Sequence, residues 1–404
     1  MKRWPRKPLG EVCSINPKLA GSDAPRSDAE VTFVPMAAID EVSGTIARPE
    51  RRRYSEVAKG YTPFTVNDVL FAKITPCMQN GKAAVASDLY GGIGFGSTEF
   101  HVLRSAGSVL PRWVFAFVRQ PGFRSAAEAS FTGSAGQQRV PADFLKTYPI
   151  PVPPLAEQER IVKLLDEADE LRKLRTQADR RTADLIPGLF HEMFGPEAPG
   201  SATWQTATVA ELAAAHEGSI RTGPFGSDLR HSEFVEEGIP VLGIDNVVEN
   251  EFRWTKSRCI PEAKFAEMKR FVVFPGDVLV TIMGTVGRCS IAPEKLPVCI
   301  STKHLCAVTL DRTKAHPRFI WGAFLHDASV KQQTRLVGKG AIMEGWNSTI
   351  IKRLRLRVPP LMLQNQFAAR VSDIRAMETE QAASRRRLDD LFQSMLHRAF
   401  NGEL

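Results

Sequence analysis

The chain of 404 residues contains few residues whose types and spacing could carry out catalysis. No phosphate-binding loop of the Gly-x-x-x-x-Gly-Lys-Ser/Thr type occurs, because Gly81-Lys82 and Lys339-Gly340 lack the flanking residues. The glycine run at 91–96 has the wrong spacing for a dinucleotide-binding fingerprint and leads into a strand-like segment, so we expect a turn there. The sequence also contains no Asn-Pro-Pro-aromatic tetrapeptide, the motif with which adenine methyltransferases hold the target amino group.

Two acidic-basic triplets, at 262–264 and 267–269, could imitate the metal-binding motif of a nuclease downstream of Asp245. Such triplets are common on exposed helices, so we expect a solvated surface there. His101 and His304 lie in strand-like runs without a partnering Cys or Asp, which favours packing roles. The sequence therefore predicts no catalytic residues.

The six cysteines are scattered, without a Cys-x-x-Cys pair or a nearby histidine cluster. This pattern favours buried thiols over a disulfide framework or a metal site, so we expect no metal in this chain. Reduced cysteines, together with the lack of a secretory signal and of an apolar run of roughly 18 residues, favour a cytoplasmic protein without a membrane span.

The charge balance favours a polyanionic partner. The formal net charge is +8, and each Lys or Arg that binds a phosphate releases condensed counterions. Arginine and lysine side chains bind DNA phosphates or pair with guanine, and glutamine side chains form hydrogen bonds with adenine. The alternative for each of these residues is that it belongs to a solvated charged surface without a ligand. The residues that we expect to contact DNA are Arg51, Arg52, Lys73, Gln79 and Lys82 in the first half, and Arg221, Ser227, Arg230, Arg288 and Lys303 in the second.

The two halves of the chain repeat one another in order. Asp-Val-Leu occurs at 68–70 and 277–279, and Val-Pro-Pro-Leu occurs at 152–155 and 358–361. Gly81-Lys82 matches Gly287-Arg288, so a cation recurs at one place in both copies, which strengthens Lys82 and Arg288 as DNA contacts. We therefore expect two copies of one unit of about 200 residues.

Each copy contains a mixed segment with strand-like runs, such as 69–74 and 278–283, and ends in a long polar helix. We predict an α/β fold with two tandem-repeated mixed α/β domains, separated by long helices that pack as an antiparallel coiled coil. The predicted division is a first domain at 1–150, a first helical region at 151–200, a second domain at 201–355 and a second helical region at 356–404.

Apolar residues at seven-residue spacing predict the contact seam of the two helices. An amphipathic helix lying on a globular core is the alternative. A helix of about 32 residues spans roughly 48 Å, enough to separate two domains by one turn of DNA. The residues assigned to the seam or to partner contacts are Gln158, Ile161, Leu164, Leu171 and Leu185 in the first copy, and Gln364, Ile374, Leu388, Leu391 and Met395 in the second.

Over nearly its whole length the chain resembles the specificity subunits of type I restriction-modification systems. The resemblance rests on the duplicated layout, on Asp-Val-Leu followed by Gly-Lys or Gly-Arg, on the turn at 223–227, and above all on the Pro-rich start of the first long helix at 151–161. It implies that each mixed segment is a target-recognition domain for one half of a split site in double-stranded DNA. It also implies that the helices dock two methyltransferase subunits.

In such a complex, S-adenosylmethionine, ATP and magnesium belong to the methyltransferase and restriction (translocase) subunits, and this chain needs no cofactor. One alternative function is a stand-alone DNA methyltransferase or nuclease with an unrecognised site. A third possibility is a scaffold that does not bind DNA, whose binding would lack a steep dependence on salt.

Overall fold

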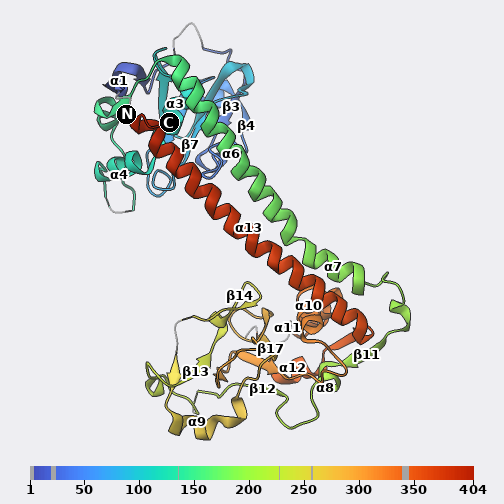
Figure 1. Cartoon of the computed structure of the whole chain (residues 1–404). Helices are drawn as coiled ribbons and strands as arrows, with labels where there is room; N and C mark the ends of the chain where they lie inside the picture. Colours follow the sequence, from blue (N-terminus) through green and yellow to red (C-terminus); the bar gives the residue numbers. More distant parts are fainter. Residues whose placement is uncertain (1–3, 20–23, 135, 227, 256–257, 339–344) are drawn as a thin grey trace. The chain divides into compact units, whose positions relative to one another are not determined.

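The computed structural model describes residues 4–19, 24–134, 136–226, 228–255, 258–338 and 345–404 (Figure 1). Contacts divide the chain into two compact units, Met1–Ala178 with Gln381–Leu404 and Asp179–Glu380, here called the first and second units. The expected domains at 1–150 and 201–355 each lie inside one unit. Each of the two helical regions is divided between the units: residues 151–178 and 381–404 belong to the first unit, and residues 179–200 and 356–380 belong to the second. Among the described residues, no helix is long and apolar enough to cross a membrane.

The first unit contains two four-stranded sheets. The antiparallel sheet of order β2-β9-β6-β7 carries the repeated Asp-Val-Leu motif, and the sheet of order β4-β3-β8-β5 contains one parallel pair, β3 with β8. The strands are β2 (Cys13–Ile15), β9 (Phe100–Ser105), β6 (Val69–Ala72) and β7 (Ala83–Val85), then β4 (Glu50–Arg53), β3 (Glu30–Val34), β8 (Ile93–Gly96) and β5 (Thr62–Thr65).

Short helices complete the first unit: α1 (Leu9–Val12), α2 (Tyr54–Val57), α3 (Pro111–Val118), α4 (Pro121–Ala129) and α5 (Ala142–Thr147). Helix α3 begins at a proline, whose fixed φ suits the first helical position, and it buries Trp113 and Val114 in the core. The Pro-rich strip forms strand β10 (Pro149–Pro151), which pairs with β1 (Arg6–Pro8) near the start of the chain.

The second unit repeats this plan, which confirms the predicted duplication. Its antiparallel sheet has the order β12-β20-β17-β18, and a second sheet of order β16-β13-β19 again contains one parallel pair. The strands are β12 (Ile220–Thr222), β20 (Leu305–Val308), β17 (Val278–Thr281), β18 (Cys289–Ile291), β16 (Cys259–Ile260), β13 (Ile239–Leu242), β19 (Ile300–Ser301), β11 (Gln205–Thr208), β21 (Arg355–Val358), β14 (Val247–Val248) and β15 (Glu251–Phe252). The short helices are α8 (Val209–Leu212), α9 (Glu262–Met268), α10 (Pro317–His326), α11 (Ala328–Gly338) and α12 (Ser348–Arg353).

The repeated Asp-Val-Leu motif has a structural cause. Asp68 and Asp277 are each 1% exposed, and each accepts a hydrogen bond from the backbone three residues earlier, at 2.7 and 2.8 Å. A buried carboxylate needs a counter-charge, and the two copies supply it from different strands. Arg104 on β9 binds Asp68 at 2.6 and 2.8 Å, whereas Arg221 on β12 binds Asp277. The strand register places Thr309 where the first unit has Arg104.

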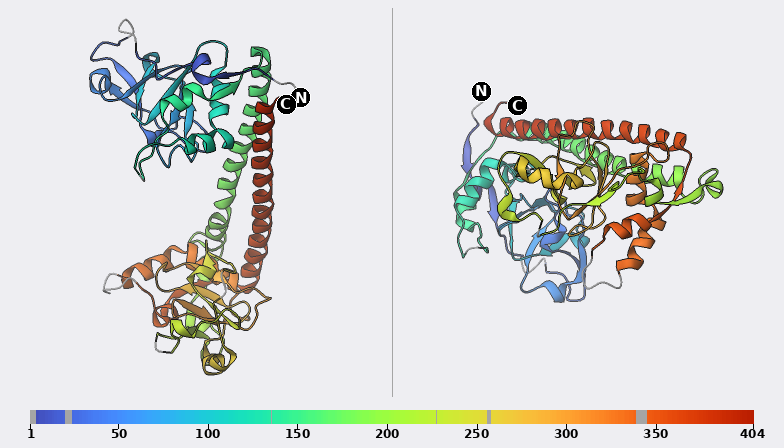
Figure 2. Two further views of the ribbon diagram at one scale, coloured as in Figure 1. Left: turned by 90° about the vertical axis from the view of Figure 1, so that its left-hand side faces the viewer. Right: turned by 90° about the horizontal axis from the view of Figure 1, so that it is seen from below.

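The long helices are α6 (Leu155–Ala183), α7 (Leu185–Phe194) and α13 (Leu361–Asn401). In the first unit, α6 and the last part of α13 run antiparallel, because Arg160 contacts Leu404 whereas Arg172 contacts Asp389 (Figure 2). In the second unit, Phe190 of α7 packs against Phe367 of α13 with ring centroids 5.7 Å apart. The predicted fold class is confirmed.

The predicted seam of these helices is wrong in detail. Leu171 is 54% exposed, Leu185 43% and Leu391 49%, so these three side chains do not lie in a helix contact. Of the other seam residues, Ile161 is fully buried, and Leu164, Ile374, Leu388 and Met395 are half-buried. The buried side of α6 instead includes Leu165, because this helix packs on the α/β core as well as on α13.

Gln158 and Gln364 are structural residues rather than exposed partner contacts. Both side chains are fully buried at the starts of α6 and α13. Gln158 accepts a bond from the Leu110 amide at 2.8 Å and donates to the Ser108 and Pro153 carbonyls at 3.0 and 2.9 Å. Gln364 makes the equivalent three bonds in the second unit. Each glutamine therefore ties the start of a long helix to the loop before α3 or α10.

Candidate nucleic-acid interface

Lys82 and Arg288 occupy equivalent places in the two units. Each residue directly precedes the outer strand of the antiparallel sheet, β7 or β18. The Lys82 carbonyl accepts a bond from the Ala72 amide at 3.0 Å, and the Arg288 carbonyl accepts one from the Thr281 amide at 2.9 Å. Arg288 is exposed and Lys82 half-buried, and within the described ranges neither cationic group has an ion-pair partner. The backbone thus fixes both positions and leaves both charges available.

In the first unit, Lys73 and Gln79 lie near Lys82, in the segment that follows β6. The Lys73 carbonyl accepts a bond from the Val140 amide at 2.9 Å, which ties this segment to the glycine-rich loop after α4. Gln79 is exposed but donates its amide to Glu128 at 2.6 Å. Both residues therefore accompany Lys82, but the side chain of Gln79 is already engaged.

Lys73 lies beside an ion pair between Arg139 and Glu99. Arg139 binds the Glu99 carboxylate at 2.8 Å, and the hydrogen bond from Arg139 lowers the pKa of Glu99 although burial opposes this. Glu99 is thus ionised at neutral pH beside Lys73. Lys73 therefore lies beside a carboxylate that is already paired, whereas Lys82 forms no ion pair within the described ranges.

Arg51 and Arg52 lie on β4, at the edge of the other sheet of the first unit. Arg52 is paired with Glu50 at 2.7 Å and stacks over the Phe33 ring at 3.8 Å, and the hydrogen bond that it donates to Glu50 raises the pKa of Arg52. The Arg51 side chain is 68% exposed, and its nearest carboxylate oxygen, on Glu30, is 4.0 Å away. Arg51 is therefore the more available of the two, on a different sheet from Lys82.

The structure contradicts the assignment of Arg221 to DNA contact. Its side chain is 7% exposed and bound to Asp277, to the Val272 carbonyl at 2.7 Å and to the Thr309 hydroxyl at 2.9 Å. The guanidinium neutralises a buried carboxylate and is not free for a ligand. The sequence could not reveal this because the equivalent arginine of the first unit comes from another strand.

The backbone of the turn after β12 packs closely against the end of β19. A Cβ on Gly223 would lie 2.0 Å from the Ser301 carbonyl oxygen, so only glycine fits there. This contact places Phe225, which is 55% exposed, on a fixed turn beside the segment of Lys303, a half-buried residue. Arg230 is exposed further along the chain. Ser227 lies outside the described residues.

A second polar group on this unit contains Trp254, a residue that sequence reasoning did not select. Trp254 is 51% exposed and lines a shallow cavity of about 250 Å³ with Asn246, Thr255 and Arg258. Asp245, considered above as part of a nuclease motif, is bound by Arg258 and by the Thr255 hydroxyl at 2.7 Å. Burial opposes ionisation of Asp245, but these bonds outweigh it and keep its pKa below the usual value. An exposed tryptophan close to an arginine in sequence was the available signal.

Metal chemistry and thiol chemistry find no support in the described ranges of the chain, where no group of three His, Cys, Asp or Glu could hold a metal ion. Lys264 of the acidic-basic triplet pairs instead with Glu233 at 2.9 Å. Five of the six free cysteines are buried, and burial raises the pKa of Cys13 and Cys306 to about 12. Such thiols stay protonated at neutral pH and are poor nucleophiles.

Comparison with known proteins adds to this geometry. Residues 1–179 match the type I restriction modification DNA specificity domain. The specificity subunits of the type I restriction enzymes EcoEI and EcoAI, both from Escherichia coli, are 41% and 40% identical to this chain over 175 residues. These matches cover 42% of this chain and 29% of each relative, so the chain spans less than a third of the length of either relative.

A solved structure from a study of complex assembly and conformational transition of the type I R-M system shares the fold. Its chain has a TM-score of 0.68 at 21% identity, over 99% of this chain and 98% of that one. The fold is thus that of two duplicated α/β units joined by long helices. The first 179 residues thus match the DNA specificity domain of type I restriction-modification systems, and the fold likeness extends over the whole chain.

Proposed function

We propose that the chain recognises a bipartite sequence in double-stranded DNA and carries out no catalysis itself. Each unit contacts one half of the site. The observation that carries the proposal is the pair of available cations, Lys82 and Arg288, at equivalent backbone positions of two duplicated sheets. A duplicated cation suits the phosphate backbone, because every nucleotide presents the same oxygens to both units.

Sequence discrimination in this proposal comes from residues that differ between the units. Arg51 is a candidate in the first unit, and Lys303, Arg230 and Trp254 are candidates in the second. Side chains that contact base edges must differ where the two half-sites differ, whereas phosphate contacts need not. This division supports Lys82 and Arg288 as positioning residues rather than specificity residues.

The proposed protein partners are two methyltransferase subunits and the restriction (translocase) subunits, with S-adenosylmethionine, ATP and magnesium bound by those partners in the cytoplasm. Leu171 and Leu174 of α6 are 54% and 52% exposed, and Leu391 of α13 is 49% exposed. Exposed leucines on long helices support docking of another subunit, because covering them removes apolar surface from water. These residues thus remain candidates for partner contact although they are not in the helix seam.

The test compares Lys82→Ala and Arg288→Ala with the unsubstituted chain, each assembled with its methyltransferase subunits. Binding isotherms are measured on cognate and scrambled duplexes at several salt concentrations. A phosphate contact predicts that each substitution weakens binding to all sequences about equally and lowers the salt slope by about one unit. Lys146→Ala is the matched control, since that lysine is paired with Asp143 at 2.9 Å on α5.

A base contact would instead cost roughly 1–3 kcal/mol on the cognate duplex alone. Affinity and salt slope equal to those of the unsubstituted complex for both variants would remove the central observation from the proposal. Methyl transfer or DNA cleavage by the purified chain alone, with labelled S-adenosylmethionine or with magnesium, would favour the stand-alone enzyme. Binding without any salt slope would favour the scaffold.

A further inference from the structure

A cavity of about 210 Å³ lies in the first unit, between α3, α4, α6 and the last part of α13. One side is apolar and is formed by Phe115, Ala116, Val162, Leu165, Phe392 and Leu396. The other side carries four arginines, Arg112, Arg119, Arg124 and Arg172. Neither the proposed DNA contacts nor the proposed docking of other subunits uses this cavity.

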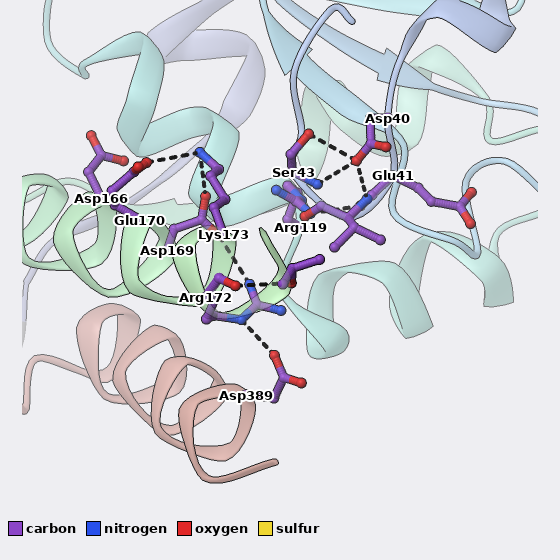
Figure 3. A network of polar contacts seen from close by, with 12 residues as sticks. Asp40, Glu41, Ser43, Arg119, Asp166, Asp169, Glu170, Arg172, Lys173 and Asp389 are labelled. Atoms are coloured by element: carbon purple, nitrogen blue, oxygen red, sulfur yellow. Dashed lines mark hydrogen bonds and ion pairs between the residues drawn. The ribbon is translucent and has the colours of Figure 1, made fainter. Parts of the chain in front are cut away.

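The carboxylates around the cavity neutralise only two of these arginines. Arg112 is bound to Asp166. Arg172 is bound to Asp169 at 3.0 Å and to Asp389 at 2.7 Å (Figure 3). Lys173 also takes part of the charge of Asp169, at 3.1 Å. These acids therefore have little charge left to offer to the remaining two guanidiniums.

Arg119 and Arg124 are bound to backbone carbonyls instead. Arg119 donates to the Glu41 and Val42 carbonyls, both at 2.8 Å, and Arg124 donates to the Gln79 carbonyl at 2.7 Å. Within the described ranges neither guanidinium has an ion pair with a carboxylate, and Figure 3 shows the Glu41 carboxylate turned away from Arg119. In the described part of the chain, two permanently charged groups thus face a partly enclosed space without a carboxylate bound to either of them.

The loops that contain Gly44 and Gly81 pass close to the guanidinium groups of Arg119 and Arg124. Gly44 and Gly81 have φ of +64° and +76°, values that favour glycine. A Cβ on Gly44 would lie 2.4 Å from Nη1 of Arg119, and one on Gly81 would lie 3.1 Å from Nη1 of Arg124. Burial and the neighbouring arginines also lower the pKa of Arg119, although Asp169 opposes this. An added negative charge would relieve that repulsion.

We propose that this cavity binds a small organic anion, a carboxylate or phosphate monoester that carries a ring. The acidic group would lie toward Arg119 and Arg124, and the ring would lie against Phe115, Phe392 and Leu396. The volume supports this class of ligand, because an apolar cavity of about 150 Å³ binds benzene, and the additional space here accommodates one acidic group. A whole nucleotide needs a larger pocket, of roughly 300 Å³ or more.

The test is calorimetric titration of the purified full chain, without DNA, with benzoate, phenyl phosphate, inorganic phosphate and phenol. Benzoate or phenyl phosphate should bind with a Kd below roughly 10 mM, and phenol and inorganic phosphate should each bind at least about tenfold more weakly. A preference for benzoate or for phenyl phosphate identifies the acidic group. Arg124→Gln should lose about tenfold in affinity, whereas Arg270→Gln, whose side chain is 72% exposed in the second unit, should lose none.

A site-resolved measurement accompanies the titration. Phenylglyoxal modification followed by mass spectrometry should show protection of Arg119 and Arg124 by the bound probe, with Arg270 unprotected. Circular dichroism and melting of Arg124→Gln exclude loss of folding as the cause of weaker binding. The proposal is overturned if no probe binds at roughly 10 mM, if Arg124→Gln binds as tightly as the unsubstituted chain, or if phenol binds as well as benzoate and phenyl phosphate. None of these measurements involves DNA, so failure here leaves the DNA-binding proposal unaffected.

Discussion

Single residues in this protein divide into buried charges that hold each unit together and exposed charges that are available to a ligand. Arg221 and Arg288 illustrate the difference, since the first is bound to Asp277 in the core and the second is exposed on the surface. Both are arginines in the second unit, and composition cannot separate them. Only the burial of their surroundings decides which one can contact DNA.

The buried ion pair gives a direct prediction about stability. Asp277→Ala leaves Arg221 buried without a counter-charge, so the free energy of unfolding should fall by about 3–5 kcal/mol. Urea denaturation followed by circular dichroism measures the change. Asp143→Ala is the control, because Asp143 is 87% exposed and paired with Lys146 on the surface, so its loss should change stability far less than the loss of Asp277. Equal losses in the two variants would contradict the assigned role of Asp277.

His326 provides a prediction about pH. Burial beside Phe190 and Trp321, with Lys331 and Arg375 nearby, lowers its pKa from 6.5 to about 4. Between these values the unfolded chain binds a proton that the folded chain does not, so stability contributed by the neutral ring is present above pH 6.5 and is lost as the pH falls toward 4.

His326→Phe should therefore flatten the fall in melting temperature between pH 6.5 and 4. The control is His397→Gln, which changes an exposed residue of α13 and should leave the acid profile as it is. A profile for His326→Phe that is as steep as that of the unsubstituted chain would show that other groups cause the acid sensitivity.

At the scale of helices and strands, the repeat was predictable from sequence, but the helix seam was not. Motifs such as Asp-Val-Leu occur in the same order and at similar spacing in both halves of the sequence. The antiparallel sheets that contain them have equivalent strand orders in the two units, as expected. The seam failed because α6 contacts two different neighbours, the α/β core and α13. Seven-residue spacing describes one contact only, so it selected Leu171, which is exposed, and missed Leu165, which is buried.

The candidate site could be predicted in part for a similar reason. A cation that recurs in both copies identified Lys82 and Arg288 without knowledge of the fold. Trp254 lies where the first copy has Arg48 at the offset of 206, so repetition gave no signal for this tryptophan. Gln158 recurs because it ties a helix to its unit, which shows that repetition marks structural residues as readily as ligand contacts.

The corrected seam can be tested by two leucine substitutions on α6. Leu165→Ala should lower the free energy of unfolding by about 2–5 kcal/mol, because its side chain is 4% exposed in the core of the first unit. Leu171→Ala should stay within about 0.5 kcal/mol, since that side chain is 54% exposed. Denaturation of both variants under one condition measures the difference, and the reverse order would restore the seven-residue seam.

At the scale of the whole molecule, duplication and divergence together explain how one chain could recognise two different half-sites. The antiparallel sheets and their buried aspartates, Asp68 and Asp277, are alike in the two units. The groups around them differ, because β4 carries Arg51 in the first unit and the second unit has Trp254 and Arg258. Each unit has its own core cluster of buried apolar residues. Specificity in one unit can therefore change without disturbing the packing of the other.

The central claim is that the two units recognise two halves of a DNA site independently, and methylome sequencing tests it most directly. A strain expressing this chain with its methyltransferase subunits is compared with one in which residues 1–150 come from a relative of different specificity. The account predicts a bipartite methylated sequence in the first strain, and in the second strain a sequence with one half replaced and the other unchanged. A change in both halves, or in neither half, would contradict it.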